Sequence, residues 1–253
     1  MGHHTGEVLI TLVSSHPLPG LKRLAQQWIQ RWDQVKGVTL NLQPRRTNQI
    51  LGSTTTVLAG DPTIREQFCG LELQLSTTTF FQINTPQAEA IVECLVHWLH
   101  QAAQHGPIVD AYCGIGTISL PLAARGHRVV GIEINPDSIE QADRNATVNG
   151  LGPLTRFEAG DVADLLKQTL PGCSALVVDP PRRGLESTVV AAILRDPPPL
   201  LAYLSCDMAT QARDLKRLLQ PEGPYQLDQL QPVDFFPQTT HLENLAFLRR
   251  ISS

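Results

Sequence analysis

From Thr85 to the end of the chain, short apolar stretches alternate with amphipathic segments, and this alternation limits the possible folds more than any other feature. A helix is expected to start at Thr85, as N-cap, and Pro86, as its first residue. Strand-helix alternation of this length predicts a mostly parallel, doubly wound α/β sheet. The last two strands have no helix between them and predict an antiparallel edge. The seven predicted strands lie near residues 107–112, 128–133, 154–158, 175–179, 200–205, 225–233 and 243–250.

The sequence before residue 81 has a different character. Glu7 to Val13 and Val38 to Leu42 contain alternating or β-branched residues, whereas Leu21 to Trp32 carries apolar residues at the spacing of an amphipathic helix. We therefore expect a small α+β domain over residues 1–80 and a larger α/β domain over residues 81–253. A chain of 253 residues is long enough to give each of them a hydrophobic core.

Composition narrows the class of protein. Hydrophobic residues make up 42% of the chain and charged residues 17%, with no apolar run long enough to span a bilayer and no basic and apolar leader at Met1. We expect a monomeric cytoplasmic protein without membrane contact. The formal net charge of -4 does not by itself indicate a nucleic-acid binder.

The number and spacing of the cysteines argue against structural roles. They are odd in number, scattered, and without C-x-x-C spacing, which argues against a disulfide framework, a structural zinc site or an iron-sulfur cluster. No bound metal is expected, and a cysteine with a function is expected to act through the reactivity of its thiol. The five are Cys69, Cys94, Cys113, Cys173 and Cys206.

Three consecutive strand ends carry residues suited to an adenosine cofactor. The turn with Gly114 and Gly116 lets a ligand approach the backbone, Glu133 can accept hydrogen bonds from both ribose hydroxyls, and Asp161 can meet an adenine amino group. Either acid alone is better explained as a helix N-cap, but the ordered set favours a cofactor. Because the third glycine of a dinucleotide motif is missing, S-adenosylmethionine is favoured over NAD.

A second group of residues predicts chemistry on a pyrimidine base. Uracil C5 is a poor nucleophile, so its methylation calls for a thiolate that adds to C6 and a base that later removes the C5 proton. Cys206 follows an apolar strand and precedes a helix whose amides could lower its pKa, while Asp207 opposes that effect. Glu243 is the candidate base, and Asp179 holds the pyrimidine edge or orders the nucleophile loop. Alone, Cys206 would be a buried hydrophobe and Glu243 a surface charge.

Several stretches together resemble the RNA uracil-5-methyltransferase family over almost the whole chain. They are Phe80 to Asn84, Asp110 to Thr117, Gly131 to Glu133, Asn145 to Gly150, Asp179 to Gly184, Tyr203 to Cys206, and Gln231 to Thr239.

The resemblance implies a Rossmann-like class I methyltransferase fold and an RNA substrate, with ribosomal RNA favoured over transfer RNA. It also implies that Cys206 is the nucleophile and Glu243 the base. Thr117 stands in the glycine stretch where some members have asparagine. The residues expected to bind the cofactor or line the site are Gln82, Tyr112, Gly114, Gly116, Thr117, Glu133, Asp161 and Asp179.

Departures from the family leave two alternatives open. Members usually carry an RNA-binding β-barrel, and many a four-cysteine iron-sulfur cluster, ahead of the segment that begins here, so we expect a naturally short member or a fragment. The first alternative is a module that binds cofactor but lacks productive RNA docking. The second is methylation of an exocyclic amine, which needs neither Cys206 nor Glu243. The aromatic pairs at Phe80 and Phe235 are expected to lie in the core.

Overall fold

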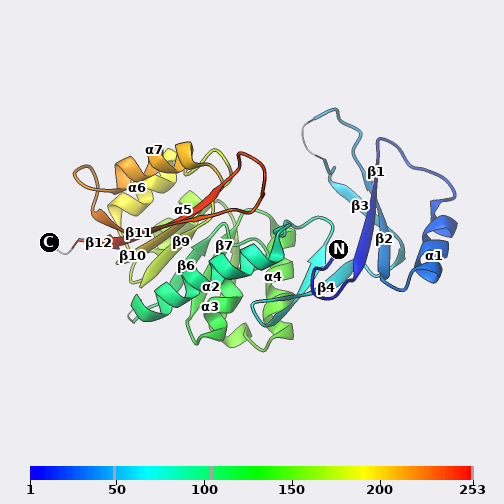
Figure 1. The fold of residues 1–253 in the computed structure, drawn as a ribbon, viewed down its shortest axis with the longest axis horizontal. Helices are drawn as coiled ribbons and strands as arrows, with labels where there is room; N and C mark the ends of the chain where they lie inside the picture. The colour runs from blue at the N-terminus through cyan, green and yellow to red at the C-terminus, as the bar shows by residue number, and fades with distance from the viewer. Residues whose placement is uncertain (48–49, 103–104, 252–253) are drawn as a thin grey trace. The chain divides into compact units, whose positions relative to one another are not determined.

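The computed structural model describes residues 1–47, 50–102 and 105–251 (Figure 1). The chain forms two compact units, Met1–Phe81 and Gln82–Ser253. Each unit has its own sheet, so each is considered by itself.

The first unit combines a three-stranded sheet with one helix and a hairpin. Strand β1 (Val8–Ser14) pairs in parallel with β2 (Val35–Leu42), which pairs antiparallel with β3 (Thr54–Gly60). Helix α1 (Leu21–Arg31) packs on this sheet through Ala25, which is buried with Val35 and Val38. Strands β4 (Thr63–Phe68) and β5 (Leu71–Ser76) form the hairpin.

Sequence patterns anticipated part of this unit. The stretches that became β1, α1 and β2 were predicted, whereas β3, β4 and β5 were not. The reason is clearest at β3, because its threonine-rich residues are mostly exposed or half-buried and show no regular alternation of apolar and polar side chains.

The second unit is built on the predicted seven-stranded sheet. Its strand order is β11-β12-β10-β9-β6-β7-β8, with β6 to β10 parallel and β12 antiparallel to both of its neighbours. The prediction of a doubly wound sheet with an antiparallel edge is confirmed. The strands are β6 (Ile108–Ala111), β7 (Val129–Glu133), β8 (Thr155–Ala159), β9 (Ala175–Val178), β10 (Leu200–Ser205), β11 (Tyr225–Val233) and β12 (Glu243–Arg250).

Helices cover both faces of this sheet, with α5, α6 and α7 on one face and α2, α3 and α4 on the other (Figure 1). Thr85 is already helical, and the side chain of Asn84 accepts a hydrogen bond from the Gln87 N–H (3.4 Å). The predicted N-cap was therefore wrong by one residue, because asparagine supplies the capping oxygen. The helices are α2 (Thr85–Ala102), α3 (Ser119–Ala124), α4 (Pro136–Val148), α5 (Val162–Thr169), α6 (Ser187–Arg195) and α7 (Met208–Leu218).

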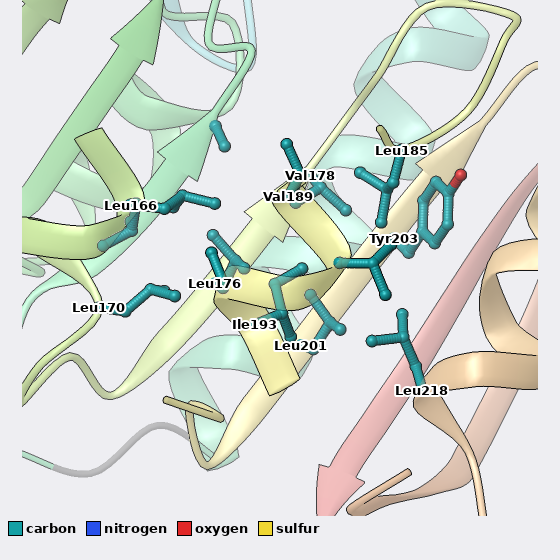
Figure 2. Close-up of a cluster of buried hydrophobic side chains, with 14 of the residues drawn as sticks. Leu166, Leu170, Leu176, Val178, Leu185, Val189, Ile193, Leu201, Tyr203 and Leu218 are labelled. Carbon is teal, nitrogen blue, oxygen red and sulfur yellow. The ribbon is translucent and has the colours of Figure 1, made fainter. Parts of the chain in front are cut away.

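The core beneath α5, α6 and α7 holds the sheet rigid. Leu176 and Leu201 point from the strands toward Leu166 of α5, Ile193 of α6 and Leu218 of α7 (Figure 2). All five side chains are fully buried. Because the central strands are covered on both faces, they read as continuous apolar runs, and polar residues are left to the strand ends.

The order of the strands creates a topological switch point at the carboxyl ends of the parallel strands, the side of the sheet called this edge below. From β6 the chain moves outward to β7 and β8, and then returns to β9 on the other side of β6. In open α/β sheets, ligands bind beyond the carboxyl ends of the strands at such a point. Because β12 runs antiparallel, its first residue, Glu243, lies at this same edge, beside the end of β10.

Replacement of Leu201 by alanine tests the contribution of this core. We expect Leu201→Ala to lower the free energy of unfolding of the second unit by about 2–5 kcal/mol, because a fully buried side chain is lost and a cavity remains. The matched control is Leu227→Ala, at a leucine that is 45% exposed, which is expected to change stability by about 0.5 kcal/mol or less. Urea titration followed by circular dichroism measures both, and equal losses in the two variants would contradict this description of the core.

Candidate active site

A tight loop follows β6 and brings its backbone to the switch point. Tyr112, Gly114 and Gly116 all have left-handed backbone, with φ of 67°, 55° and 89°. At Gly116, a Cβ atom would lie 3.1 Å from the side chain of Leu120. Glycine suits two of these positions, whereas Tyr112 holds a conformation that is unfavourable for a side chain. Such strain at a strand end is typical of a ligand-binding site.

Glu133 links this loop to the end of β7. One carboxylate oxygen accepts a hydrogen bond from the Gly114 N–H (3.3 Å), and the other accepts one from the Asn135 N–H (2.9 Å). The N-cap of α4 is Asn135, whose side chain accepts from the Asp137 N–H. Glu133 therefore does not cap that helix, and its half-buried carboxylate lies against the glycine loop.

Asp161 does cap its helix, as the simpler interpretation expected. Its Oδ1 accepts from the N–H groups of Ala163 (2.9 Å) and Asp164 (3.3 Å) at the start of α5. The residue is exposed at the end of the loop that follows β8. Two other predicted residues, Gln82 and Thr117, are half-buried, and none of the hydrogen bonds found in the described part of the chain joins them to the glycine loop.

Two residues at this edge were missed by the sequence analysis. Asp110 is fully buried at the carboxyl half of β6, where its Oδ2 accepts from the Ser119 hydroxyl (2.5 Å). Its Oδ1 has no hydrogen-bond partner among residues 1–47, 50–102 and 105–251. Burial, reinforced by the charge of Glu133, raises the pKa of Asp110 to about 7 against these hydrogen bonds. Ile134, directly after Glu133, leaves an apolar side chain 69% exposed.

Asp179 and Cys206, which follow β9 and β10, lie close to Glu243, the first residue of β12. Burial raises the pKa of Asp179 well above its usual range, and the charges of Glu243 and Asp110 add to that effect. Burial, Glu243 and Asp179 together raise the pKa of Cys206, while the Arg182 guanidinium opposes the rise. Burial also raises the pKa of Glu243, and Arg182 again opposes it. The four side chains therefore lie within one another's electric fields.

The two carboxylates of this cluster have no fixed partners. Within the residues that the structure describes, no hydrogen bond or ion pair holds the side chain of Asp179 or of Glu243, although Glu243 is only 5% exposed. Carboxylates whose pKa values are displaced by burial and by neighbouring charges, at the ends of sheet strands, are typical of functional sites.

The expectation that helix amides lower the pKa of Cys206 was wrong. The pKa of this thiol is raised, because burial and two nearby carboxylates outweigh the Arg182 charge and the backbone hydrogen bond that lower it. The first turn of α7 is also occupied, since the Asp207 side chain accepts from the Thr210 N–H (2.9 Å). This hydrogen bond lowers the pKa of Asp207 rather than that of Cys206.

Helix α7 holds the loop that carries Asp179 and Arg182. The Thr210 hydroxyl donates to the carbonyl of Arg182 (3.1 Å), and the buried carboxylate of Asp214 accepts from the Leu185 N–H (2.8 Å). Tyr203 of β10 donates its hydroxyl proton to the same Asp214 oxygen (2.9 Å). Helix α7 thus contacts both the strand that leads to Cys206 and the loop that carries Asp179.

The aromatic pairs do not all lie in the core. Phe235 is buried, as expected, and its carbonyl accepts from the Asn84 side chain (3.1 Å). Phe80 is 73% exposed, so its predicted core position was wrong. It lies in an irregular segment that follows the last strand of the first unit.

Metal and membrane sites were sought in the same ranges. Among the described residues, no group of three or more His, Cys, Asp or Glu side chains could hold a metal ion. None of the helices in those ranges combines the length and apolarity needed to cross a bilayer. All five cysteines are free thiols.

Known proteins match this chain along its whole length. The family model for tRNA (uracil-5-)-methyltransferase matches residues 4–251. An uncharacterized RNA methyltransferase of Parasynechococcus marenigrum is 83% identical over 253 residues, which are 100% of this chain and 54% of that relative. One from Nostoc sp. is 43% identical over 249 residues, 98% of this chain and 54% of the relative. The chain thus spans about half the length of the curated relatives it matches.

Solved structures match as well. The Pyrococcus abyssi tRNA (uracil-54, C5)-methyltransferase, solved in complex with S-adenosyl-L-homocysteine, aligns with a TM-score of 0.78 and 28% identity. The alignment covers 98% of this chain and 57% of that one. The Methanocaldococcus jannaschii tRNA m1G37 methyltransferase aligns with a TM-score of 0.59 at 14% identity, over 98% of this chain and 71% of that one, and shows a shared fold alone.

The raised pKa of Asp110 predicts a pH-dependent loss of stability. An aspartate whose pKa rises from about 3.8 to about 7 on folding contributes stability below pH 4 that is lost as the pH rises through 7. Asp110→Asn cannot ionise, so wild-type protein should lose up to about 4 kcal/mol relative to this variant between pH 4 and pH 7, at about 1.36 kcal/mol per pH unit. Urea titrations at several pH values measure the difference.

The control is Asp137→Asn, at an exposed aspartate in the first turn of α4. Its unfolding free energy should follow the wild-type pH profile. An Asp110→Asn profile parallel to that of the wild type would show that Asp110 is ionised in the folded protein.

Proposed function

The chain belongs to the tRNA (uracil-5-)-methyltransferase family, and from this premise we propose that it transfers a methyl group from S-adenosylmethionine to C5 of a uridine in RNA. The observation that carries the proposal is the cluster of Asp179, Cys206 and Glu243, a thiol with two unpaired carboxylates beside the switch point of the sheet. These are the groups that C5 methylation needs, in the place where the fold binds ligands.

The proposed cofactor residues fit the polar groups of S-adenosylmethionine. Glu133 offers its carboxylate to the ribose hydroxyls, and the Asp161 Oδ2, which takes no part in the helix cap, is available to the adenine amino group. Ile134 presents an exposed apolar surface for the adenine ring, and the backbone of Gly114 and Gly116 leaves room for a close approach. S-adenosylmethionine supplies a methyl group made electrophilic by its bond to a sulfonium sulfur.

In the proposed mechanism Cys206 is the nucleophile. The thiol gives its proton to solvent, and its sulfur forms a bond to C6 of the uracil as the C5=C6 π electrons move to C5. C5 then takes the methyl group, and the electron pair of the broken methyl–sulfur bond stays on the cofactor sulfur. The Arg182 guanidinium favours the thiolate, since it lowers the pKa of Cys206 against the effects of burial. Asp179, whose pKa is raised well above its usual range, lies at the end of β9 beside Cys206, where its carboxyl group can hydrogen-bond the edge of the uracil ring.

Glu243 completes the proposed sequence. After methyl transfer, its carboxylate removes the proton from C5, the electrons of that C–H bond form the C5=C6 double bond, and the C6–S bond breaks to release Cys206. The raised pKa of Glu243 makes it a stronger base than an exposed glutamate. Its position at the start of β12, beside the end of β10, supports this role.

The RNA class is a further part of the proposal. The sequence resemblance favours ribosomal RNA, whereas the Pyrococcus abyssi protein is by its name a tRNA methyltransferase. Sequencing the RNA that becomes covalently attached to the protein distinguishes the two classes.

Removal of the thiol tests the nucleophile. We expect Cys206→Ala to lower RNA methylation by at least about 1000-fold, because the thiol that forms the adduct with C6 is lost. Binding of S-adenosylmethionine, measured by calorimetry, should stay within about twofold. The matched control, Cys94→Ala in α2, should retain activity. If Cys206→Ala keeps its turnover, the reaction does not use a thiol adduct, and methylation of an exocyclic amine becomes the better account.

Neutralisation of Glu243 tests the base. In Glu243→Gln, methyl transfer should proceed while elimination stalls, so a methylated covalent complex of protein and RNA should accumulate. Denaturing gel electrophoresis with labelled RNA measures this complex, and wild-type protein and the Glu93→Gln control should show little of it. The proposed role is wrong if Glu243→Gln loses turnover without ever trapping RNA.

A further inference from the structure

Gln211 in α7 is a buried polar residue for which the mechanism above has no use. Its side-chain Nε2 donates to the carbonyl of Tyr203 (2.9 Å) and to that of Asn244 (3.1 Å). Its Oε1 accepts from the side chain of Asn244 (2.5 Å). Gln211 is 2% exposed and Asn244 is also buried, so water does not compete for these bonds. Both amide hydrogens and the carbonyl oxygen of Gln211 are therefore in use.

These bonds join the two strands that lead to Cys206 and Glu243. Tyr203 belongs to β10, Asn244 belongs to β12, and the register pairs Ser205 with Asn244. That pair is the last one of the ladder, because Cys206 lies beyond the end of β10 and Glu243 is the first residue of β12. Gln211 thus clamps the two strands together at the last residue pair of their ladder.

The position of the Glu243 carboxylate depends on these hydrogen bonds through the backbone of β12. No hydrogen bond or ion pair holds its carboxylate within the described ranges, so its location follows from the backbone. On one side that backbone pairs with Val233 of the edge strand β11. On the other side, toward β10, the next residue, Asn244, pairs with Ser205 and is hydrogen-bonded to Gln211.

We propose that Gln211 is a positioning residue, which fixes the Glu243 carboxylate beside the Cys206 thiol by clamping β12 to β10. Its use for removal of the C5 proton rests on the function proposed above, but the geometric claim stands without it. An apolar side chain of similar length makes none of the three hydrogen bonds, so Gln211→Met frees the start of β12 from the nucleophile strand.

The ionisation of Cys206 reports the position of Glu243, because the charge of Glu243 raises the pKa of the thiol. The test measures the rate of iodoacetamide alkylation at Cys206 against pH, with peptide mass spectrometry to separate this site from the other cysteines. Four proteins are compared with the wild type: Gln211→Met, Glu243→Gln, the double variant, and the control Gln226→Met, at an exposed glutamine of β11.

Both single variants at the site should lower the alkylation midpoint, by about half a pH unit or more, because each takes negative charge away from the thiol. The double variant should match Glu243→Gln alone, since no charge is left to displace, and Gln226→Met should match the wild type. The proposal is overturned if Gln211→Met leaves the midpoint unchanged, or if it shifts the midpoint equally with and without Glu243.

Asn244→Ala provides a second variant, with the fold of each protein checked by circular dichroism. It removes one donor to Gln211 but keeps the backbone carbonyl contacts, so a smaller downward shift is expected, and no shift counts against the clamp. The alkylation assay needs neither RNA nor S-adenosylmethionine. The assay therefore tests the positioning role of Gln211 even if the protein does not methylate uridine, so the two proposals can fail independently.

Discussion

The site depends on the meeting of strand ends at one side of a sheet whose central strands are buried. Strands β6, β9 and β10 are buried along their whole length, so their polar side chains gather where the strands finish. The antiparallel course of β12 then brings Glu243 to the same edge from the opposite chain direction. In this way, the loops after β6, β9 and β10 and the start of β12, far apart in sequence, bring a glycine turn, a thiol and carboxylates to the same side of the sheet.

Burial raises the pKa values of these carboxylates, and it also lowers the stability of the folded protein. Asp110, Asp179 and Glu243 all have raised pKa values chiefly because they are removed from water. A fold that only needed stability would pair such carboxylates or replace them. Helix α7 offsets part of the cost, since its buried Gln211 and Asp214 satisfy backbone groups of β10, β12 and the loop after β9.

Much of the fold could be read from the sequence, because period and apolar runs report burial directly. The seven strands of the second unit were predicted to within one or two residues, and the family assignment is confirmed by the match over residues 4–251. Exposed polar strands such as β3 carry no such signal and were missed.

Properties that depend on several distant residues were also outside the reach of sequence patterns. Sequence places Cys206 before a helix, but only the structure brings two carboxylates close enough to raise the pKa of the thiol. The unpaired oxygen of Asp110 and the clamp made by Gln211 likewise depend on tertiary contacts.

The measurement that tests the central claim most directly is the intact mass of the protein after incubation with S-adenosylmethionine and RNA containing 5-fluorouridine. Fluorine at C5 leaves no proton for Glu243 to remove, so the reaction should stop as a methylated RNA adduct whose mass maps to Cys206. An unmodified protein mass, in a sample that still binds S-adenosylmethionine, would contradict the claim that this chain methylates uridine C5 through a thiol adduct.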